Sequence, residues 1–245
     1  METRTRSAAI SSTGGLVQGG RLQGDLDQDG QVQDGRIQDG RIQKGNETRR
    51  TVLGRAVSIA SVEGLDGLSL GRLAAELELS KSGVFALFGS KEELQLATVR
   101  AAQRIYVEVV IEPVRRLPAG VGQLWELCLR WLEYSRTRVF AGGCFFYAVG
   151  AEFDARPGRV RDALAASSLA WHRTVLEMCQ AAAASGELRA DADLEQLAFE
   201  FSSFLEYANA LSLLHGQDGP YDRARRSVLL LLRSESADES LLPAG

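Results

Sequence analysis

The stretch from Leu79 to Phe88 holds the residues with the clearest potential for chemistry, and that chemistry is contact with nucleic acid. Ser80 is a typical N-cap residue, so a short helix is predicted to begin at Lys81. Lys81 and Ser82 then lie near the helix N-terminus, where an ammonium group and a hydroxyl group can bond base edges or phosphates. Gly83 has no side chain and so lets the helix backbone come close to the DNA. Such residue types suit the end of a helix that enters the DNA major groove.

A preceding short helix is needed to position that end. Ser69 is its predicted N-cap, and the helix runs to Leu77. Ala74 is small, as required where the second helix crosses the first. The apolar seam between the two helices is supplied by Leu70, Leu73, Leu77 and Leu79. Together the two segments form a predicted helix–turn–helix unit.

The remainder of the chain reads as helical from about residue 46. An apolar stripe over 51–60 predicts a helix that ends at Glu63-Gly64, and Ser90-Lys-Glu-Glu93 opens a long helix to about Arg115. Further helices are predicted over about 121–138, 143–153, 158–185, 193–214 and 221–233. No segment shows the period-2 alternation of a strand. The predicted fold class is therefore all-α, with a three-helix DNA-binding domain and a larger helical domain.

The block over residues 47–98 resembles the DNA-binding domain of the TetR family of transcriptional regulators. The run Leu79-Ser-Lys-Ser-Gly-Val-Phe-Ala-Leu-Phe-Gly-Ser-Lys-Glu-Glu-Leu94 carries most of this resemblance. The run Ala141-Gly-Gly-Cys-Phe-Phe-Tyr147 is similar to a Gly-Gly-Cys-Phe segment of one C-terminal subgroup. The resemblance implies nine helices, homodimerisation through the last two, and a ligand pocket in the larger domain.

Three residues depart from the family pattern. Phe85 stands where family members usually have a tyrosine, and Leu87 where they have a histidine or tyrosine, so neither can bond a phosphate in the family's way. Glu78 occupies a turn position where glycine is common, which costs roughly 1 kcal/mol if the backbone is left-handed. Residues 46–100 hold seven basic and seven acidic residues, so any positive surface must be local. Phe85 is equally compatible with the core and with the groove.

Candidate contact residues follow from the helix starts and the basic side chains around them. Residues expected to contact DNA are Arg49, Arg50, Ser69, Arg72, Ser80, Lys81, Ser82, Gly83, Phe85 and Lys91. The expected partner is a double-stranded, approximately palindromic operator, because a two-fold dimer would present two reading helices to successive major grooves.

The larger domain is rich in aromatic residues, most of which are expected to pack in the core. A subset is predicted to line a pocket for a small, largely apolar effector: Trp125, Tyr134, Phe145, Trp171 and Tyr207. The last two helices have broad apolar faces, so the segments 193–214 and 221–233 are predicted to form the homodimer interface.

The domain boundaries are expected at compositional changes. Residues 1–45 contain imperfect five-residue repeats such as Arg36-Ile-Gln-Asp-Gly40, whose period suits neither helix nor strand, and are expected to be a disordered low-complexity extension. A small repeat solenoid is the alternative. The DNA-binding domain is then 46–98, the effector-binding and dimerisation domain 99–234, and a flexible tail 235–245.

Several other functions find little support. No apolar run is long enough for a membrane span, and three widely spaced cysteines with no leader-like start point to the cytoplasm. With two histidines, no metal site, cofactor or catalytic group is expected, and Glu152 and Asp154 are interpreted as a solvated helix end. Cys144 is either a redox-sensing thiol or, as we favour, a structural residue.

The prediction is a non-enzymatic, ligand-responsive transcriptional regulator, acting as a repressor. Two alternatives remain open: a helical small-molecule carrier or enzyme with a vestigial reading head, and a helical scaffold that binds only proteins. Alanine at both Lys81 and Lys91 distinguishes the three hypotheses, because only the regulator is expected to lose DNA binding while it keeps dimerisation and ligand binding.

Overall fold

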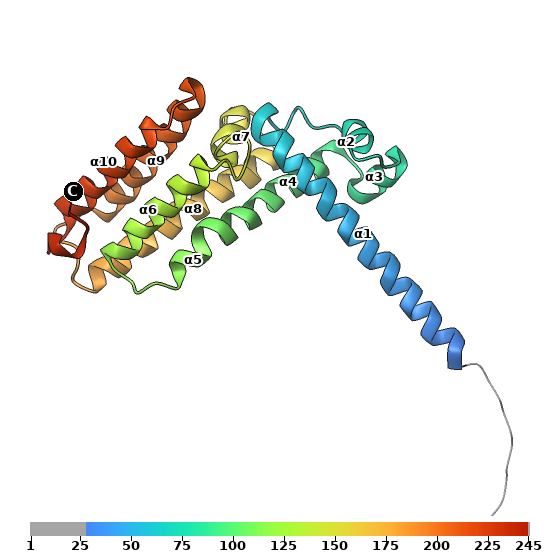
Figure 1. Ribbon diagram of the computed structural model, residues 1–245, viewed down its shortest axis with the longest axis horizontal. Helices are drawn as coiled ribbons and strands as arrows, with labels where there is room; N and C mark the ends of the chain where they lie inside the picture. Colours follow the sequence, from blue (N-terminus) through green and yellow to red (C-terminus); the bar gives the residue numbers. More distant parts are fainter. Residues whose placement is uncertain (1–27, 245) are drawn as a thin grey trace, which may run out of the picture. The chain divides into compact units, whose positions relative to one another are not determined.

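The computed structural model describes the backbone of residues 28–244 and the side chains of residues 43–244, and the described part is all-helical (Figure 1). The elements are α1 (Gln28–Glu63), α2 (Leu70–Glu76), α3 (Lys81–Phe88), α4 (Lys91–Tyr106), the π-helix η1 (Val107–Ile111), α5 (Glu112–Arg115), α6 (Val121–Arg136), α7 (Phe145–Phe153), α8 (Arg159–Ala184), α9 (Leu194–His215), α10 (Gly219–Glu235) and the 3₁₀-helix η2 (Glu239–Leu241). With α4, η1 and α5 counted as one continuous helix, and η2 set aside, the described residues hold nine helices. No described helix has the length and apolarity needed to span a membrane.

Helices α2 and α3 form the predicted helix–turn–helix unit, and the serine caps of α2, α3 and α4 are as expected. Ser69, Ser80 and Ser90 each accept the backbone N–H of the third residue that follows, at 3.1 Å in all three cases. The core between the helices consists of Val52, Ala56, Ile59, Leu65, Leu68, Leu73, Ala74, Val84, Phe88 and Leu94, all of which are buried. The sequence prediction of this unit is confirmed.

Helix α1 starts further upstream than the sequence predicts. The repeats over 28–45 were expected to form no helix, whereas the structure includes them in α1. Extending a helix costs less than nucleating one, so the packed turns around Val52 and Ala56 can propagate toward the N-terminus despite the glycines. Residues 1–27 of the expected extension lie outside the described residues.

The long helix after Ser90 changes its hydrogen-bond pattern once. Over Val107–Ile111 it widens to a π-helix before resuming as α5. Pro113 cannot donate a backbone hydrogen bond, and its ring crowds the carbonyl one turn earlier, so a local widening is a physically reasonable response. The sequence predicted the helix to Arg115 but not this widening.

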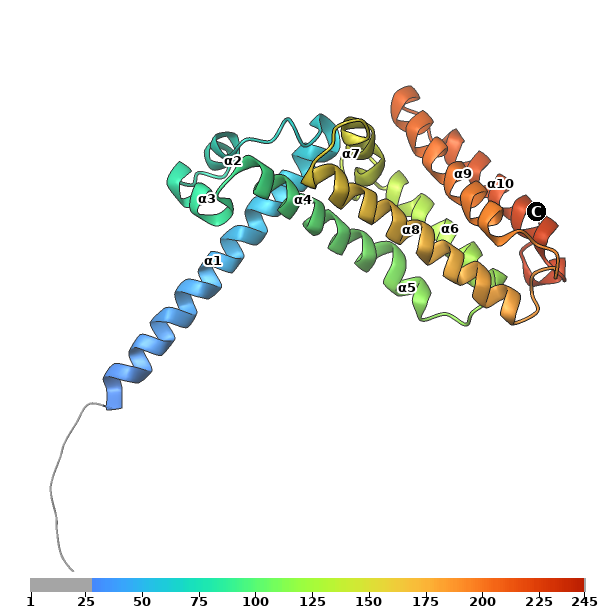
Figure 2. The ribbon, with the colours of Figure 1, turned by 180° about the vertical axis from the view of Figure 1, so that it is seen from behind.

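The C-terminal helices form a bundle that continues from α4 (Figures 1 and 2). Helix α8 packs against α4, α7 and α9, and α10 packs against α9 and α6. The predicted flexible tail from residue 235 is instead attached to the bundle as far as it is described. Ala237 donates its N–H to the Glu187 carbonyl at 2.9 Å, and Leu242 is buried, because the apolar end of the tail finds a place on the bundle.

The turn before α3 contains the left-handed residue that the sequence analysis considered. Glu78 is exposed and has φ +55°, a conformation that glycine adopts without a Cβ penalty. We expect Glu78→Gly to raise the free energy of unfolding by about 1 kcal/mol. Ala75→Gly, in the exposed part of α2, should lower it by about the same amount. Urea titrations of both variants test this, and a destabilised Glu78→Gly protein would contradict the assignment of strain to this residue.

Candidate functional site

The N-terminal end of α3 is exposed and held in shape by its cap. Ser80 Oγ accepts the Gly83 N–H, and Ser82 Oγ lies 3.5 Å from Ser80 Oγ. A Cβ on residue 83 would lie 2.8 Å from Ser80 Oγ, so glycine at this position keeps the cap intact. Lys81 and Ser82 are both exposed. The N-terminal end of α3 with Lys81, Ser82 and Gly83, called the reading end below, is therefore an exposed and preorganised surface.

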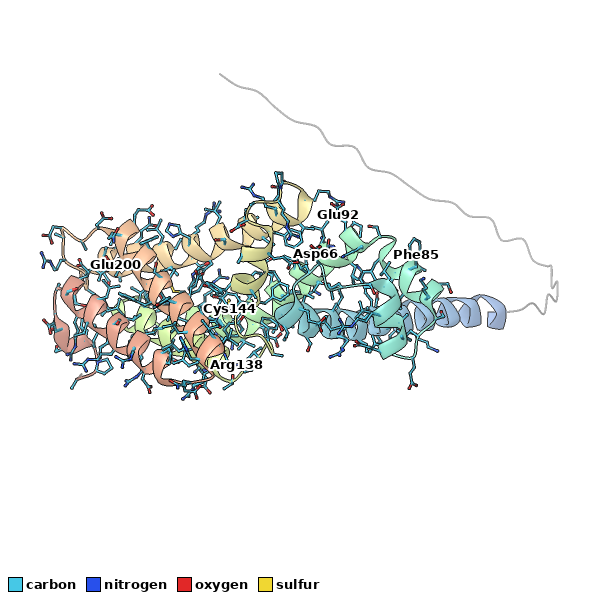
Figure 3. All side chains as sticks on the ribbon, turned by 90° about the horizontal axis from the view of Figure 1, so that it is seen from above. Asp66, Phe85, Glu92, Arg138, Cys144 and Glu200 are labelled. Carbon is cyan, nitrogen blue, oxygen red and sulfur yellow. The ribbon has the colours of Figure 1, made fainter. Side chains whose placement is uncertain are left out.

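Phe85, which the sequence left between core and groove, lies on the surface. Its side chain is 55% exposed, whereas Val84 and Phe88 on the same helix are buried (Figure 3). Leu87 is half-buried and packs against the core, so its place in the core accounts for the missing polar group. An exposed aromatic ring beside Lys81 and Ser82 offers an apolar contact, such as one with a thymine methyl group.

The structure separates the predicted basic contacts into free and engaged groups. Arg49 donates to the Leu87 carbonyl, and its guanidinium lies 4.6 Å from the Phe88 ring centroid, so it ties α1 to the end of α3. Arg50 is exposed. Lys91 donates to the Asp66 carbonyl at 2.7 Å but remains half exposed.

Arg72 is the predicted contact whose charge is most fully matched. Its guanidinium bonds both oxygens of Glu63, at 2.5 and 2.8 Å, and one oxygen of Glu76 at 2.8 Å. These bonds hold the pKa of both carboxyl groups below the usual range. Arg55 also bonds Glu76, at 2.6 Å. Arg72 therefore joins a network between α1 and α2, whereas Arg50, Lys81, Ser82, Phe85 and Lys91 are exposed.

A cavity of about 630 Å³ lies in the larger domain. Its walls come from α4, η1, α5, α6, α7, α8 and α9. The aromatic residues among them are Tyr106, Trp131, Phe146, Tyr147, Phe153 and Trp171. Tyr106 is the centre of this group, because its ring meets Phe146 at 5.6 Å and Trp171 at 5.8 Å in steep edge contacts.

Only one of the five predicted pocket residues, Trp171, lines this cavity. Trp125, Tyr134 and Phe145 are buried in the core, where Tyr134 and Phe145 pack behind the lining residues Tyr106 and Phe146, and Tyr207 is 65% exposed on α9. The choice among aromatic residues depended on the rotation of each helix, which a single sequence does not fix. The signal that was missed is the spacing of Gln103, Tyr106 and Val107, which places three lining residues on one face of the linking helix.

The cysteines are packing residues in this structure. Cys144 lines the cavity but is buried, and its burial raises the pKa of the thiol to about 11. Burial likewise raises the pKa of Cys128 and of Cys179 to about 12. Protonated thiols are poor nucleophiles, which supports the structural interpretation of Cys144. Among the residues described, no three His, Cys, Asp or Glu side chains are grouped as metal ligands.

Glu152 connects the cavity to the DNA-binding unit, and its assignment to a solvated helix end was wrong. Its two carboxylate oxygens accept the backbone N–H groups of Leu65 at 2.7 Å and Asp66 at 2.9 Å. The neighbours of Glu152 on α7, Ala151 and Phe153, line the cavity. A side chain on Gly64 would collide with this carboxylate, with its Cβ only 2.5 Å from Oε2.

Further contacts reinforce the same junction. Gly142 donates its N–H to Ser61 Oγ at 3.2 Å, and a Cβ on Gly142 would lie 1.7 Å from the Ser61 carbonyl oxygen. Arg156 bonds Asp66 at 2.5 Å, and Arg159 bonds both Glu92 and Glu93; Asp66 and Glu92 are labelled in Figure 3. The start of α7 and the start of α8 are therefore attached to the end of α1 and the start of α4.

Comparisons with known proteins agree with this architecture. Residues 120–228 match the family model described as the tetracyclin repressor-like C-terminal domain. No curated protein matches the chain. A TetR transcriptional regulator from Chloroflexus aurantiacus has a similar structure, with 24% identity, 79% of this chain and 98% of that chain covered, and a TM-score of 0.74.

Two other similar structures contain ligands. A putative transcriptional regulator from Saccharomonospora viridis in complex with choline has 19% identity and a TM-score of 0.66. The match covers 79% of this chain and 99% of that chain. AibR, in complex with isovaleryl coenzyme A and operator DNA, has 19% identity, 75% and 97% coverage, and a TM-score of 0.62.

The helix–turn–helix unit, the cavity-bearing helical domain and the match over 120–228 lead to one assignment. Members of this family are transcription factors rather than enzymes. Residues 120–228 match the tetracyclin repressor-like C-terminal domain, and the described residues have the fold of TetR transcriptional regulators.

Proposed function

We propose that this protein is a repressor that binds an approximately palindromic operator as a homodimer and leaves it when a small organic molecule occupies the cavity. The observation that carries the proposal is the exposed N-terminal end of α3, where Lys81, Ser82 and Phe85 stand on a capped, preorganised helix. That end has the residue types and exposure needed to contact base edges and phosphates.

The dimer is supported by apolar side chains that the single chain leaves uncovered. On α9, Phe199, Tyr207 and Leu214 are 63%, 65% and 79% exposed, and on α10 Leu230 is 56% exposed. Large side chains at these levels of exposure on two adjacent helices are costly in water, and a second copy of the same pair would cover them. The predicted interface over 193–214 and 221–233 is therefore retained in the proposal.

The effector site is supported by the cavity and by two structural relatives. The walls around Tyr106 and Trp171 are mostly apolar with a few polar groups, as in small-molecule sites generally. Choline and isovaleryl coenzyme A in the relatives show that proteins of this fold hold organic molecules, and AibR holds operator DNA as well.

The junction at Glu152 supplies a physical connection for release. An occupant that moves α7 by pressing on Phe146 or Ala151 also moves the carboxylate that holds Leu65 and Asp66. Two reading units joined through a dimer interface then change their separation, and the operator half-sites no longer match.

The test of the reading end is a single substitution. We expect Lys81→Ala to weaken selective operator binding by roughly tenfold and to reduce the slope of log affinity against log salt by about one. Arg173→Ala, an exposed cation on α8, is the matched control and should leave both quantities unchanged. Fluorescence anisotropy at two or more salt concentrations measures both. Equal affinities for the two variants would argue that α3 is not the reading helix.

A further inference from the structure

The cavity combines aromatic rings with two carboxylates, those of Asp154 and Glu206. Rings from four helices meet there: Tyr106 from α4, Trp131 from α6, Phe146 from α7 and Trp171 from α8. Tyr106 is inclined at 75° to Phe146 and at 78° to Trp171, so the rings wall the space from different directions. Glu206 contributes its carboxylate from α9. Rings arranged around a space in this way attract cations through their negative faces.

Glu206 has no cationic partner among the described residues that surround it. No ion pair or hydrogen bond joins it to an arginine, lysine or histidine, in contrast to Glu195 on the same helix, which bonds His172 at 3.0 Å. It interacts electrostatically with the hydroxyl of Tyr106 and the thiol of Cys144, both of which are uncharged at neutral pH. The Glu206 side chain is exposed in the single chain, yet the protein around the carboxyl desolvates it and raises its pKa, and a bound cation would reverse that shift.

The two arginines of the cavity wall stand away from the aromatic rings. Arg161 precedes Trp171 by ten residues on α8, which is about 15 Å along a helix, and Arg115 follows Tyr106 by nine residues, about 13 Å. Helices α4 and α8 begin together, because Arg159 bonds Glu92 and Glu93, so the arginines lie on opposite sides of the Tyr106–Trp171 contact. Each also has a carboxylate partner: Arg161 bonds Asp162 at 3.3 Å and Arg115 bonds Glu112 at 3.5 Å.

We infer that the cavity binds organic cations, such as an alkylammonium or quaternary ammonium compound, with the cationic head among Tyr106, Trp131, Phe146 and Trp171 and against Glu206. This refines the largely apolar effector expected from the sequence to an amphipathic cation. It rests on the proposed function only in treating the cavity as the effector site. The apolar tail would run along the wall formed by Val107 and Ile111.

The experiment compares three probes of similar length that differ in charge: hexyltrimethylammonium, 1-heptanol and heptanoate. Calorimetry with the full chain measures each dissociation constant. We expect the cation to bind at least tenfold tighter than the alcohol and the carboxylate to bind weakest. Equal binding of cation and alcohol, or tightest binding of heptanoate, would overturn the inference.

Variants assign any preference to the named residues. Glu206→Gln should reduce the preference for the cation over the alcohol roughly tenfold, whereas Glu200→Gln on the same helix, outside the cavity lining, should retain it. Trp171→Leu should lose most of the preference and Trp171→Phe should keep part of it. An unaltered preference in Glu206→Gln would contradict the assignment.

The readout is direct binding without DNA, so it separates this inference from the proposed function. Selective cation binding without any effect on operator affinity would contradict the proposed release mechanism and leave the inference intact. Operator release by heptanoate alone would contradict the inference of cation binding and leave the proposed release mechanism intact.

Discussion

Gly142→Ala is expected to lower the free energy of unfolding by about 3 kcal/mol or more, the largest effect of any single methyl group considered in this protein. The added Cβ would lie 1.7 Å from the carbonyl oxygen of Ser61 and 2.5 Å from its carbonyl carbon, and both are backbone atoms that cannot rotate away. Ser61 is itself 3% exposed, so the end of α1 has little room to retreat. Thermal and urea unfolding followed by circular dichroism measure the loss.

Gly122→Ala is the matched control for this substitution. Gly122 lies in α6, and nothing stands within 4 Å of the position its Cβ would take. Replacing a helical glycine in open space should raise the free energy of unfolding by about 0.5–1 kcal/mol. If Gly142→Ala unfolded at the same urea concentration as the parent protein, the close approach of the α6–α7 turn to α1 would be contradicted.

Glu152→Ala is expected to uncouple the cavity from the reading unit while costing about 2 kcal/mol of stability. The carboxylate is the acceptor for the N–H groups of both Leu65 and Asp66, so its removal leaves two donors without this partner. Operator affinity without effector should change little, because α3 and its caps are untouched. The factor by which an effector weakens operator binding should fall from the 5- to 150-fold range typical of allosteric coupling toward one.

The measurement is a thermodynamic cycle of operator affinity with and without a cavity ligand such as hexyltrimethylammonium. Glu152→Gln keeps one acceptor oxygen and should give an intermediate coupling factor. Glu177→Ala removes an exposed carboxylate of α8 that lines no part of the cavity and serves as the control. Full coupling in Glu152→Ala would show that release travels by another route.

Local signals made the helix–turn–helix unit predictable. Ser69, Ser80 and Ser90 are N-cap residues whose geometry depends only on the next three residues, so the sequence could locate three helix starts correctly. The leucine seam around Leu73 followed from helical spacing. The strained turn at Glu78 was anticipated conditionally, and its positive φ satisfies that condition.

Features that depend on how each helix is rotated about its axis in the packed fold were not predictable in the same way. Tyr134 and Phe145 look as suitable for a pocket as Tyr106 and Phe146 do, and only the packing of α6 and α7 separates core rings from wall rings. The pairing of Glu152 with the end of α1 joins residues 87 positions apart, and nothing in its local sequence distinguishes it from a solvated carboxylate.

Ion pairing distinguishes the candidate DNA-contact residues in a way that the sequence does not show. Arg72 and Lys81 are equally basic in the sequence, but Arg72 faces two carboxylates from α1 and α2, whereas Lys81 projects from a helix start with its ammonium exposed. Lys81 and Lys91 with Arg50 make a small positive surface, in keeping with the neutral balance of residues 46–100. Selectivity would then depend more on α3 than on phosphate attraction.

The most direct test of the central claim is a binding titration of the full chain against DNA fragments from around its own gene, with competitor DNA present and at two salt concentrations. We expect a sequence-selective, salt-dependent complex centred on an inverted repeat, with two chains per site and roughly tenfold weaker selective binding in Lys81→Ala. A folded protein that binds every fragment, including the competitor, with the same affinity would contradict the account.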